Sequence, residues 1–252
     1  MALKILITND DGVNAPGIKL LAAWAKQFGE VTVVAPKSEQ SGKSQGIEFM
    51  KAVEIKEVPF IDGVKAYSVN STPADCVRFG IVGLKEKYDL ALSGLNRGEN
   101  VGADIVYSGT VGAIYESSRH KIPSIAFSTF ADTQDEACKY FDTAFKFIQE
   151  KNLFENTYML NVNIPANPKG ARVTQQGGIY FCDGFIKAEG ENMYVQTGEI
   201  ISDERPDDLD RDTVAIHNGY ISVTPLMMTR TDMKTFEKHR ESLSLAKLDS
   251  SL

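Results

Sequence analysis

The sequence of 252 residues contains few cysteines and histidines, and it has no apolar run long enough to span a lipid bilayer. The three cysteines are widely spaced and form no CxxC pair, which argues against a zinc cluster and against a framework of disulfides. The three histidines show no spacing typical of metal ligands. Thiol-based metal sites and disulfide frameworks are therefore not expected.

Basic residues are outnumbered by acidic ones. The chain has 27 lysines and arginines against 34 aspartates and glutamates, a net charge of −7, and no block of basic residues. This balance argues against a nucleic-acid polymer as the main partner, but it leaves room for a small phosphorylated substrate. No membrane partner is expected. Because Asp10 and Asp11 interrupt the first apolar stretch, we expect no signal peptide and a cytoplasmic location.

Several well-known active-site motifs are missing as well. The sequence has neither a Walker phosphate loop nor a GxGxxG fingerprint, which excludes the usual nucleotide-binding loops. It also has no GxSxG elbow, which weakens the case for a serine-triad esterase.

What is present is an alternation of apolar strands and amphipathic helices. We expect strands over residues 3–8, 31–35, 64–69, 90–93, 124–127 and 159–164. Between them, we expect helices from Pro16 to Phe28, after a cap at Thr72, after a cap at Ser108 or Thr110, and over 137–148. This order predicts an α/β fold with a doubly wound, mainly parallel sheet.

The C-terminal part is less regular. Residues 175–212 show no helical period, residues 220–224 read as a strand, and residues 231–248 read as a terminal helix. We therefore expect a core over residues 1–174 and a β-rich extension over residues 175–252 that returns to the core and serves subunit contacts.

Two acidic residues, Asp10 and Asp11, directly follow the first strand. Adjacent carboxylates repel each other and lose hydration when they are buried, and a bound cation removes both costs. In a doubly wound sheet, the strand exits gather at one edge, which would bring Ser41 and Asn96 close to the pair. These oxygen ligands suit magnesium, manganese or calcium. The alternative interpretation is that either aspartate is an ordinary helix cap or turn residue.

A glycine-rich segment, 96–102 with 107–112, runs into the predicted third helix. Free N–H groups at a helix start favour an anion, and Asn100, Ser108 and Thr110 could donate hydrogen bonds to a phosphate. Ordinary turn and capping chemistry would explain the same residues. A cation held opposite an anion site indicates phosphoryl transfer, and without a kinase-type loop we expect water as the acceptor. The residues thus predict phosphomonoester hydrolysis.

The ordered motifs of the chain resemble the family of the stationary-phase survival protein SurE, a 5′-nucleotidase. The matching segments cover almost the whole chain: residues 8–13 with 15–18, 33–36 with 40–42, 72–77, 93–98 with Asn100, 107–111, 161–165 and 219–226.

The resemblance implies a Rossmann-like, metal-dependent phosphatase core acting on nucleoside monophosphates, and in some members on 3′-nucleotides and short polyphosphate. Mapped by motif, it implies one divalent ion on Asp10, Asp11, Ser41 and Asn96, and a phosphate pocket of Asn100, Ser108, Gly109 and Thr110. It assigns catalysis to Asp10, Asp11 and Asn96, with Asp10 as nucleophile or base. It also implies a homodimer or homotetramer.

The chain departs from the family pattern at Gln45–Glu48, at Ser71 and along the arm from Tyr180 to Asp212. Base preference, chain-length preference and assembly therefore stay open. Two other classes also stay open. A response-regulator receiver pairs acids after its first strand, although here a serine and a glycine stand where its phospho-acceptor would be. A non-catalytic nucleotide or metal sensor could keep every ligand.

Overall fold

The computed structural model describes residues 2–201 and 203–240. Its strands, in chain order, are β1 (Leu3–Thr8), β2 (Gly29–Pro36), β3 (Ile55–Glu57), β4 (Lys65–Val69), β5 (Leu90–Arg97), β6 (Ser124–Thr129), β7 (Met159–Asn163), β8 (Ala171–Val173), β9 (Phe181–Lys187), β10 (Tyr194–Ile200) and β11 (Ile221–Leu226). Nine of them form one sheet in the order β3-β4-β2-β1-β5-β6-β7-β11-β8. The remaining pair, β9 and β10, forms a separate antiparallel hairpin.

The middle of the large sheet is parallel, from β4 through β2, β1, β5 and β6 to β7. The strands β3 and β11 are antiparallel to their neighbours β4 and β7. From β1 the chain first builds outward through β2 and β4, and it then returns to β5 on the other side of β1. The strand order therefore reverses between β1 and β5, which is where ligands bind in open α/β sheets.

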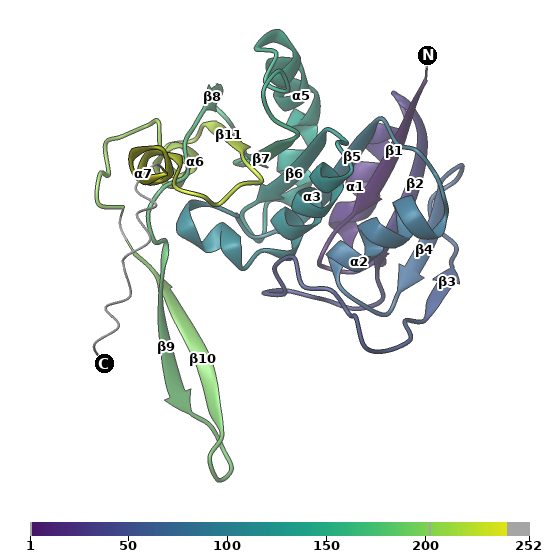
Figure 1. Cartoon of the computed structure of the whole chain (residues 1–252), viewed down its shortest axis with the longest axis horizontal. Helices are drawn as coiled ribbons and strands as arrows, with labels where there is room; N and C mark the ends of the chain where they lie inside the picture. Colours follow the sequence, from purple (N-terminus) through teal and green to yellow (C-terminus); the bar gives the residue numbers. More distant parts are fainter. Residues whose placement is uncertain (1, 202, 241–252) are drawn as a thin grey trace, which may run out of the picture.

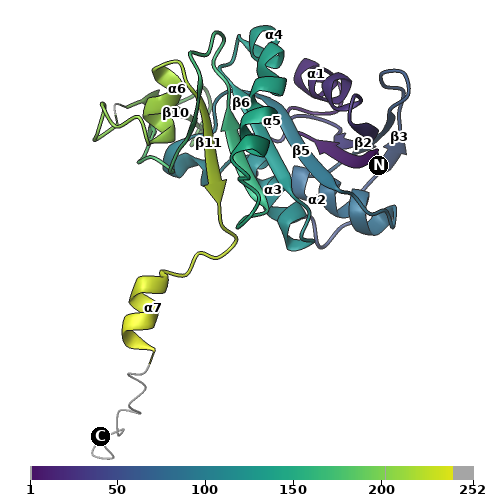
Figure 2. The same ribbon diagram turned by 90° about the horizontal axis from the view of Figure 1, so that it is seen from above.

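Helices cover both faces of the sheet (Figures 1 and 2). The helices α1 (Pro16–Ala25) and α5 (Phe141–Glu150) pack on one face, and α2 (Pro73–Arg78) and α3 (Gly109–Arg119) pack on the other. Alternate residues of β1 show the two layers, because Ile5 and Ile7 join the core under α1 whereas Leu6 joins the core under α2. The predicted doubly wound α/β fold is confirmed.

Local details follow the expected chemistry with some corrections. The Thr72 side chain caps α2, and Pro73 occupies its first position, as predicted. The cap of α3 is Ser108 rather than Thr110, which lies inside the helix. The helix predicted over 137–148 is broken into α4 (Gln134–Ala137), a 3₁₀ segment (Cys138–Tyr140) and α5. The strand predicted over 90–93 extends as β5 through Arg97, so Asn96 lies on the strand itself.

The C-terminal part contains more regular structure than its sequence indicates. Residues 175–212 include the β9–β10 hairpin, which projects from the body in Figure 1. A short helix, α6 (Asp212–His217), then leads into β11, which pairs with β7 in the large sheet. The last described helix, α7 (Met233–His239), stands away from the body in Figure 2 and forms part of the predicted terminal helix, whose end lies outside the described residues. The boundary between core and extension stays a prediction.

Within the described part of the chain, every helix is too short or too polar to cross a membrane.

Candidate active site

Three predicted site residues, Asp10, Asn96 and Thr110, meet where β1 and β5 end against the start of α3. The Thr110 hydroxyl lies 2.5 Å from Asp10 Oδ1, and the Thr110 N–H donates to Asp10 Oδ2 at 3.1 Å. The same hydroxyl lies 3.3 Å from Asn96 Oδ1. The fold thus brings together residues that are far apart in the sequence, at the point where the strand order reverses.

Asp10 is a buried carboxylate without a cationic partner. Only 4% of its surface is exposed, and within residues 2–201 and 203–240 no lysine, arginine or histidine forms an ion pair with it. Burial and, to a smaller extent, the Asp11 carboxylate raise the pKa of Asp10, while the hydrogen bonds from Thr110 lower it, and the net pKa is about 6. Burial also raises the pKa of Asp11, against the hydrogen bond from the Arg97 N–H at 3.3 Å.

These observations test whether a cation fits the site. Two neighbouring acids, both with raised pKa values, would gain most from a divalent ion, and the neutral oxygens of Asn96 and Ser41 could complete a hard-oxygen ligand set. In the described ranges, no three His, Cys, Asp or Glu side chains gather as metal ligands. The donor set therefore fits magnesium, manganese or calcium better than zinc.

A tight turn shapes the acidic loop. The Asn9 side chain forms two hydrogen bonds with the backbone of Gly12. It donates to the Gly12 carbonyl at 2.9 Å and accepts from the Gly12 N–H at 3.2 Å. Gly12 has a φ of +104°, which side chains rarely adopt. The Asp10 carbonyl in turn accepts from the Gln40 N–H at 2.7 Å, which brings the loop of Ser41 to the site.

Ser41 is exposed, and its hydroxyl donates to Glu39 Oε1 at 2.8 Å. It lines the same cavity as Asp10 and Asn96. The structure therefore places Asp10, Ser41 and Asn96 around one cavity, and Asp11 beside it, where Asp11 Oδ2 accepts from the N–H of the lining residue Arg97. Their role as metal ligands stays a prediction.

The start of α3 fits closely against Asp10. A Cβ atom added at Gly109 would lie 2.9 Å from both Cβ and Oδ2 of Asp10, so a side chain there would displace the carboxylate. The Ser108 side chain caps the helix by accepting from the Val111 N–H at 3.1 Å. One helix N–H, that of Thr110, is already bonded to Asp10 and not free for an anion.

Asn100 is held by a polar network that the sequence reasoning did not assign to the site. Its N–H donates to Asn163 Oδ1 at 2.9 Å, and its side-chain amide donates to Ser128 Oγ at 2.8 Å. Its carbonyl accepts from the side chains of Asn161 at 2.7 Å and Asn163 at 2.9 Å. The available signal was two asparagines at alternate positions of the otherwise apolar strand β7, both fully buried.

A cavity of about 450 Å³ opens from this site. Predicted residues in its lining are Asp10, Ser41, Asn96, Asn100 and Ser108, whereas Asp11, Gly109 and Thr110 lie beside it. Three lining residues come from the hairpin, and none of them was predicted: Phe181, Asp183 and Gln196. The volume suits a small organic ligand.

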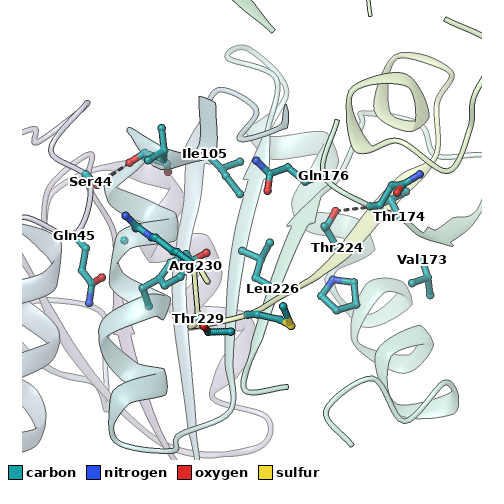
Figure 3. Close-up of a pocket in the computed structure, with 17 residues that line it drawn as sticks. Ser44, Gln45, Ile105, Val173, Thr174, Gln176, Thr224, Leu226, Thr229 and Arg230 are labelled. Carbon is teal, nitrogen blue, oxygen red and sulfur yellow. Dashed lines mark hydrogen bonds between the residues drawn. The ribbon is translucent and has the colours of Figure 1, made fainter. Parts of the chain in front are cut away.

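Figure 3 shows residues that line a second cavity, of about 600 Å³. It is lined by residues of α3, β11 and the segment that follows β11, among them Leu226 and Arg230. Ser108 is the predicted site residue that it shares with the first cavity. The acidic pair is not part of its lining, so we assign the chemistry to the smaller cavity.

Comparison with known proteins gives the family of the chain. The family model described as "Survival protein SurE" matches residues 5–182. The chain belongs to the SurE family. This membership confirms the resemblance found in the motifs and excludes the receiver alternative.

The SurE relatives match over nearly their full length. A protein from Thermoanaerobacter sp. (strain X514), named 5′-nucleotidase SurE, is 41% identical over 240 residues, covering 91% of this chain and 94% of the relative. One of the same name from Thermosipho melanesiensis is 39% identical and covers 95% of this chain and 97% of its own. A 5′-nucleotidase hydrolyses a phosphomonoester, so the predicted reaction class is confirmed at the level of the SurE family.

The SurE fold is matched as well. The crystal structure of the SurE protein from Aquifex aeolicus superposes with a TM-score of 0.77 at 35% identity, covering 93% of this chain and 97% of that chain. The alternation of strands and helices in the sequence therefore led to the right architecture.

Proposed function

We propose that this protein is a metal-dependent 5′-nucleotidase that hydrolyses nucleoside monophosphates to nucleoside and inorganic phosphate. The observation that carries the proposal is the buried carboxylate of Asp10 beside the half-buried Asp11, at the point of strand reversal and next to the start of α3. Among the described residues no cation forms an ion pair with Asp10, which lines a cavity of about 450 Å³. The names of the SurE relatives support the same reaction.

In this proposal, Asp10, Asp11, Ser41 and Asn96 hold one divalent ion, which when bound polarises the phosphoryl group and offsets its developing charge. Asn96 completes the set from β5, and its amide donates to the Gly98 carbonyl at 2.7 Å, which leaves its Oδ1 directed toward Asp10 and Thr110.

The phosphate is proposed to bind between Asn100 and the start of α3. The Ser108 hydroxyl oxygen accepts from Val111, and within the described residues its hydrogen has no protein acceptor, so it can donate to a phosphate oxygen. The Gly109 backbone allows close approach at the same place. The network around Asn100 fixes this wall of the cavity.

Asp10 then acts in one of two ways. It removes a proton from the water that attacks the phosphorus while the bond to the nucleoside oxygen breaks and the nucleoside leaves. Alternatively, it attacks the phosphorus itself, the nucleoside leaves, and water hydrolyses the resulting acyl phosphate. In either case Thr110 holds both carboxylate oxygens in place. Trapping labelled phosphate on acid-quenched protein would indicate direct attack, and its absence in a competent single turnover would indicate the base.

The proposal extends to 3′-nucleotides and short polyphosphate as additional substrates, to a homodimer or homotetramer, and to a cytoplasmic location. The exposed apolar side chains of the hairpin and of α7 support the assembly.

The test is release of inorganic phosphate from AMP and GMP by chelator-treated protein, with manganese, magnesium or calcium added back. We expect no release without metal and turnover with at least one ion. Absence of release with every ion and nucleotide would leave the non-catalytic sensor as the better description. Parallel assays with 3′-AMP and tripolyphosphate decide the substrate range.

A further inference from the structure

A chain of three side chains links the exposed His217, through the buried Tyr180, to Glu99 at the substrate cavity. The Tyr180 hydroxyl oxygen lies 2.8 Å from Glu99 Oε1 and 2.5 Å from His217 Nε2. Tyr180 is 3% exposed, and burial together with the nearby Glu99 carboxylate raises its pKa well above the usual range, so the phenol stays protonated.

A phenol has one hydrogen to give. The arrangement that satisfies all three groups has His217 Nε2–H donating to the Tyr180 oxygen and the Tyr180 O–H donating to Glu99. Each group thereby fixes the next, and the Glu99 carboxylate is held in a single orientation. Its second oxygen, Oε2, accepts no hydrogen bond from the part of the chain that the structure describes.

The support behind this carboxylate is rigid. The His217 ring packs against Phe130, with centroids 5.3 Å apart, and against Tyr180, with centroids 5.6 Å apart. On the other side, Asp104 Oδ2 accepts the N–H groups of Tyr180 at 2.7 Å and Phe181 at 3.0 Å. The base of the hairpin is therefore fastened next to Glu99.

Glu99 lies where the sugar of a bound nucleotide is expected. It lies on the loop that follows β5, between Asn96 at the end of that strand and Asn100, and it lines the same cavity as both. Three residues of chain span at most about 11 Å, so the Cα atom of Glu99 lies within that distance of the Cα atom of Asn96. The ribose is the part of the substrate that follows the phosphate directly. Phe181, farther along the wall, offers an apolar ring to the base.

We propose that Glu99 recognises the ribose: its carboxylate, oriented by Tyr180 and His217, accepts hydrogen bonds from the 2′- and 3′-hydroxyls and favours ribonucleotides over 2′-deoxyribonucleotides. The inference rests on the proposed function and deepens it. A carboxylate suits this role because it only accepts hydrogen bonds, and each of the two adjacent hydroxyls has one hydrogen to donate.

The experiment measures kcat/KM for AMP, 2′-deoxy-AMP and p-nitrophenyl phosphate, which has no sugar. The wild-type protein should prefer AMP over 2′-deoxy-AMP by roughly tenfold or more, since hydrogen bonds to charged groups give effects of that size. In Glu99→Gln and Glu99→Ala this ratio should fall toward one. Turnover of p-nitrophenyl phosphate should stay unchanged or rise, because a negative charge near the phosphate has been removed.

Asp183→Asn is the matched control, because Asp183 also lines the cavity and its loss removes the same charge. It should leave the AMP to 2′-deoxy-AMP ratio unchanged. Tyr180→Phe tests the positioning residue: the ratio should fall part of the way, through KM rather than kcat, with p-nitrophenyl phosphate turnover retained.

The proposal is overturned if the ratio is the same in wild type and Glu99→Ala, or if p-nitrophenyl phosphate turnover falls in parallel with that of AMP. A wild-type protein that hydrolyses none of the three substrates contradicts the proposed function, and the role of Glu99 falls with it. An unchanged ratio in an active enzyme contradicts the role of Glu99 alone.

Discussion

Asp10 is the side chain on which the proposed chemistry depends most. It is buried, it lies next to a second acid, and its partners are two donors of Thr110 rather than a cation. A carboxylate in such a place weakens the metal-free fold and gains from an ion. Its role can therefore be separated into a catalytic part and a stability part.

Replacing Asp10 by asparagine should abolish most hydrolysis and leave the fold intact. The new amide can donate to the Thr110 oxygen, while the Thr110 hydroxyl turns to Asn96 Oδ1, 3.3 Å away. We expect kcat/KM for AMP to fall by at least about a hundredfold, as for the loss of other charge-stabilising groups. The exposed Asp132, changed to asparagine, is the control. Unchanged turnover in Asp10→Asn would remove Asp10 from the mechanism.

The metal-free stability should depend on pH through the same carboxyl. Asp10 has a pKa of 3.8 as a free side chain and about 6 in the fold, so folding favours its protonated form. The contribution of the protonated Asp10 to the free energy of unfolding is fully present below about pH 4, and it is lost as the pH rises to about 6. At about 1.4 kcal/mol per pH unit, the loss is on the order of 3 kcal/mol.

Urea unfolding of the chelator-treated protein checks this expectation. Between pH 4 and pH 7, the free energy of unfolding of the wild type should fall relative to that of Asp10→Asn. At pH 7 the variant should melt several degrees higher than the wild type. If the two stability curves run parallel over this range, Asp10 does not titrate as described. A lower melting temperature of the variant would reveal a structural role of the charge.

The helix α3 acts on the site through its close fit against Asp10, in addition to the phosphate that is proposed to bind near its start. Its first residue, Gly109, has no room for a side chain against Asp10, and the next, Thr110, supplies both hydrogen bonds to that carboxylate. A shift of the start of α3 would therefore move the Asp10 carboxylate that follows β1.

Gly109→Ala should displace Asp10 and reduce both activity and metal binding, because the added methyl would approach the carboxylate to 2.9 Å. We expect kcat/KM to fall at least about tenfold, since small displacements of reacting groups have large effects on rate. Manganese titration by calorimetry should show weaker binding. Gly198→Ala is the control, because the nearest atoms to its added Cβ lie at 3.8 Å. Equal metal affinity in wild type and Gly109→Ala would contradict the fit.

At the scale of the whole molecule, contacts within the single chain do not explain how the β9–β10 hairpin is stabilised. A two-stranded hairpin is at best marginally stable alone, and this one exposes large apolar side chains such as Phe185, which is 70% exposed. Three of its residues also line the cavity. A second copy that covers the hairpin would bury its apolar surface and hold the cavity wall in place.

Phe185→Asp should therefore reduce the subunit count measured by light scattering and lower the activity at high dilution. Val82→Asp is the control, because Val82 is similarly exposed, at 62%, but lies in the π-helical segment Phe79–Gly83 after α2, outside the hairpin. A wild-type protein that is monomeric at all concentrations would refute the proposed assembly.

Local patterns were enough to predict the architecture. The apolar runs and the spacing of Ile18, Leu21 and Ala22 gave the strands and α1, and Thr72 with Pro73 marked the start of α2. Short-range signals failed where tertiary contacts decide. The three-residue strands β3 and β8 form because a neighbouring strand offers a free edge, and the residues before α5 turn into a 3₁₀ segment within one continuous apolar pattern.

The amino-acid order by itself determined the sheet, its exits and the acidic pair, because periodicity and chain direction fix which residues leave the sheet at the same edge. The tertiary structure alone decided that Thr110 is bonded to Asp10 and not free for a phosphate. It also decided that Asn161 and Asn163 donate to the Asn100 carbonyl. Likewise, only the tertiary structure places Glu99 in the cavity lining with a hydrogen bond from the buried Tyr180. Each of these contacts joins residues remote in the chain, and their distances depend on how helices and strands pack, which no local pattern encodes.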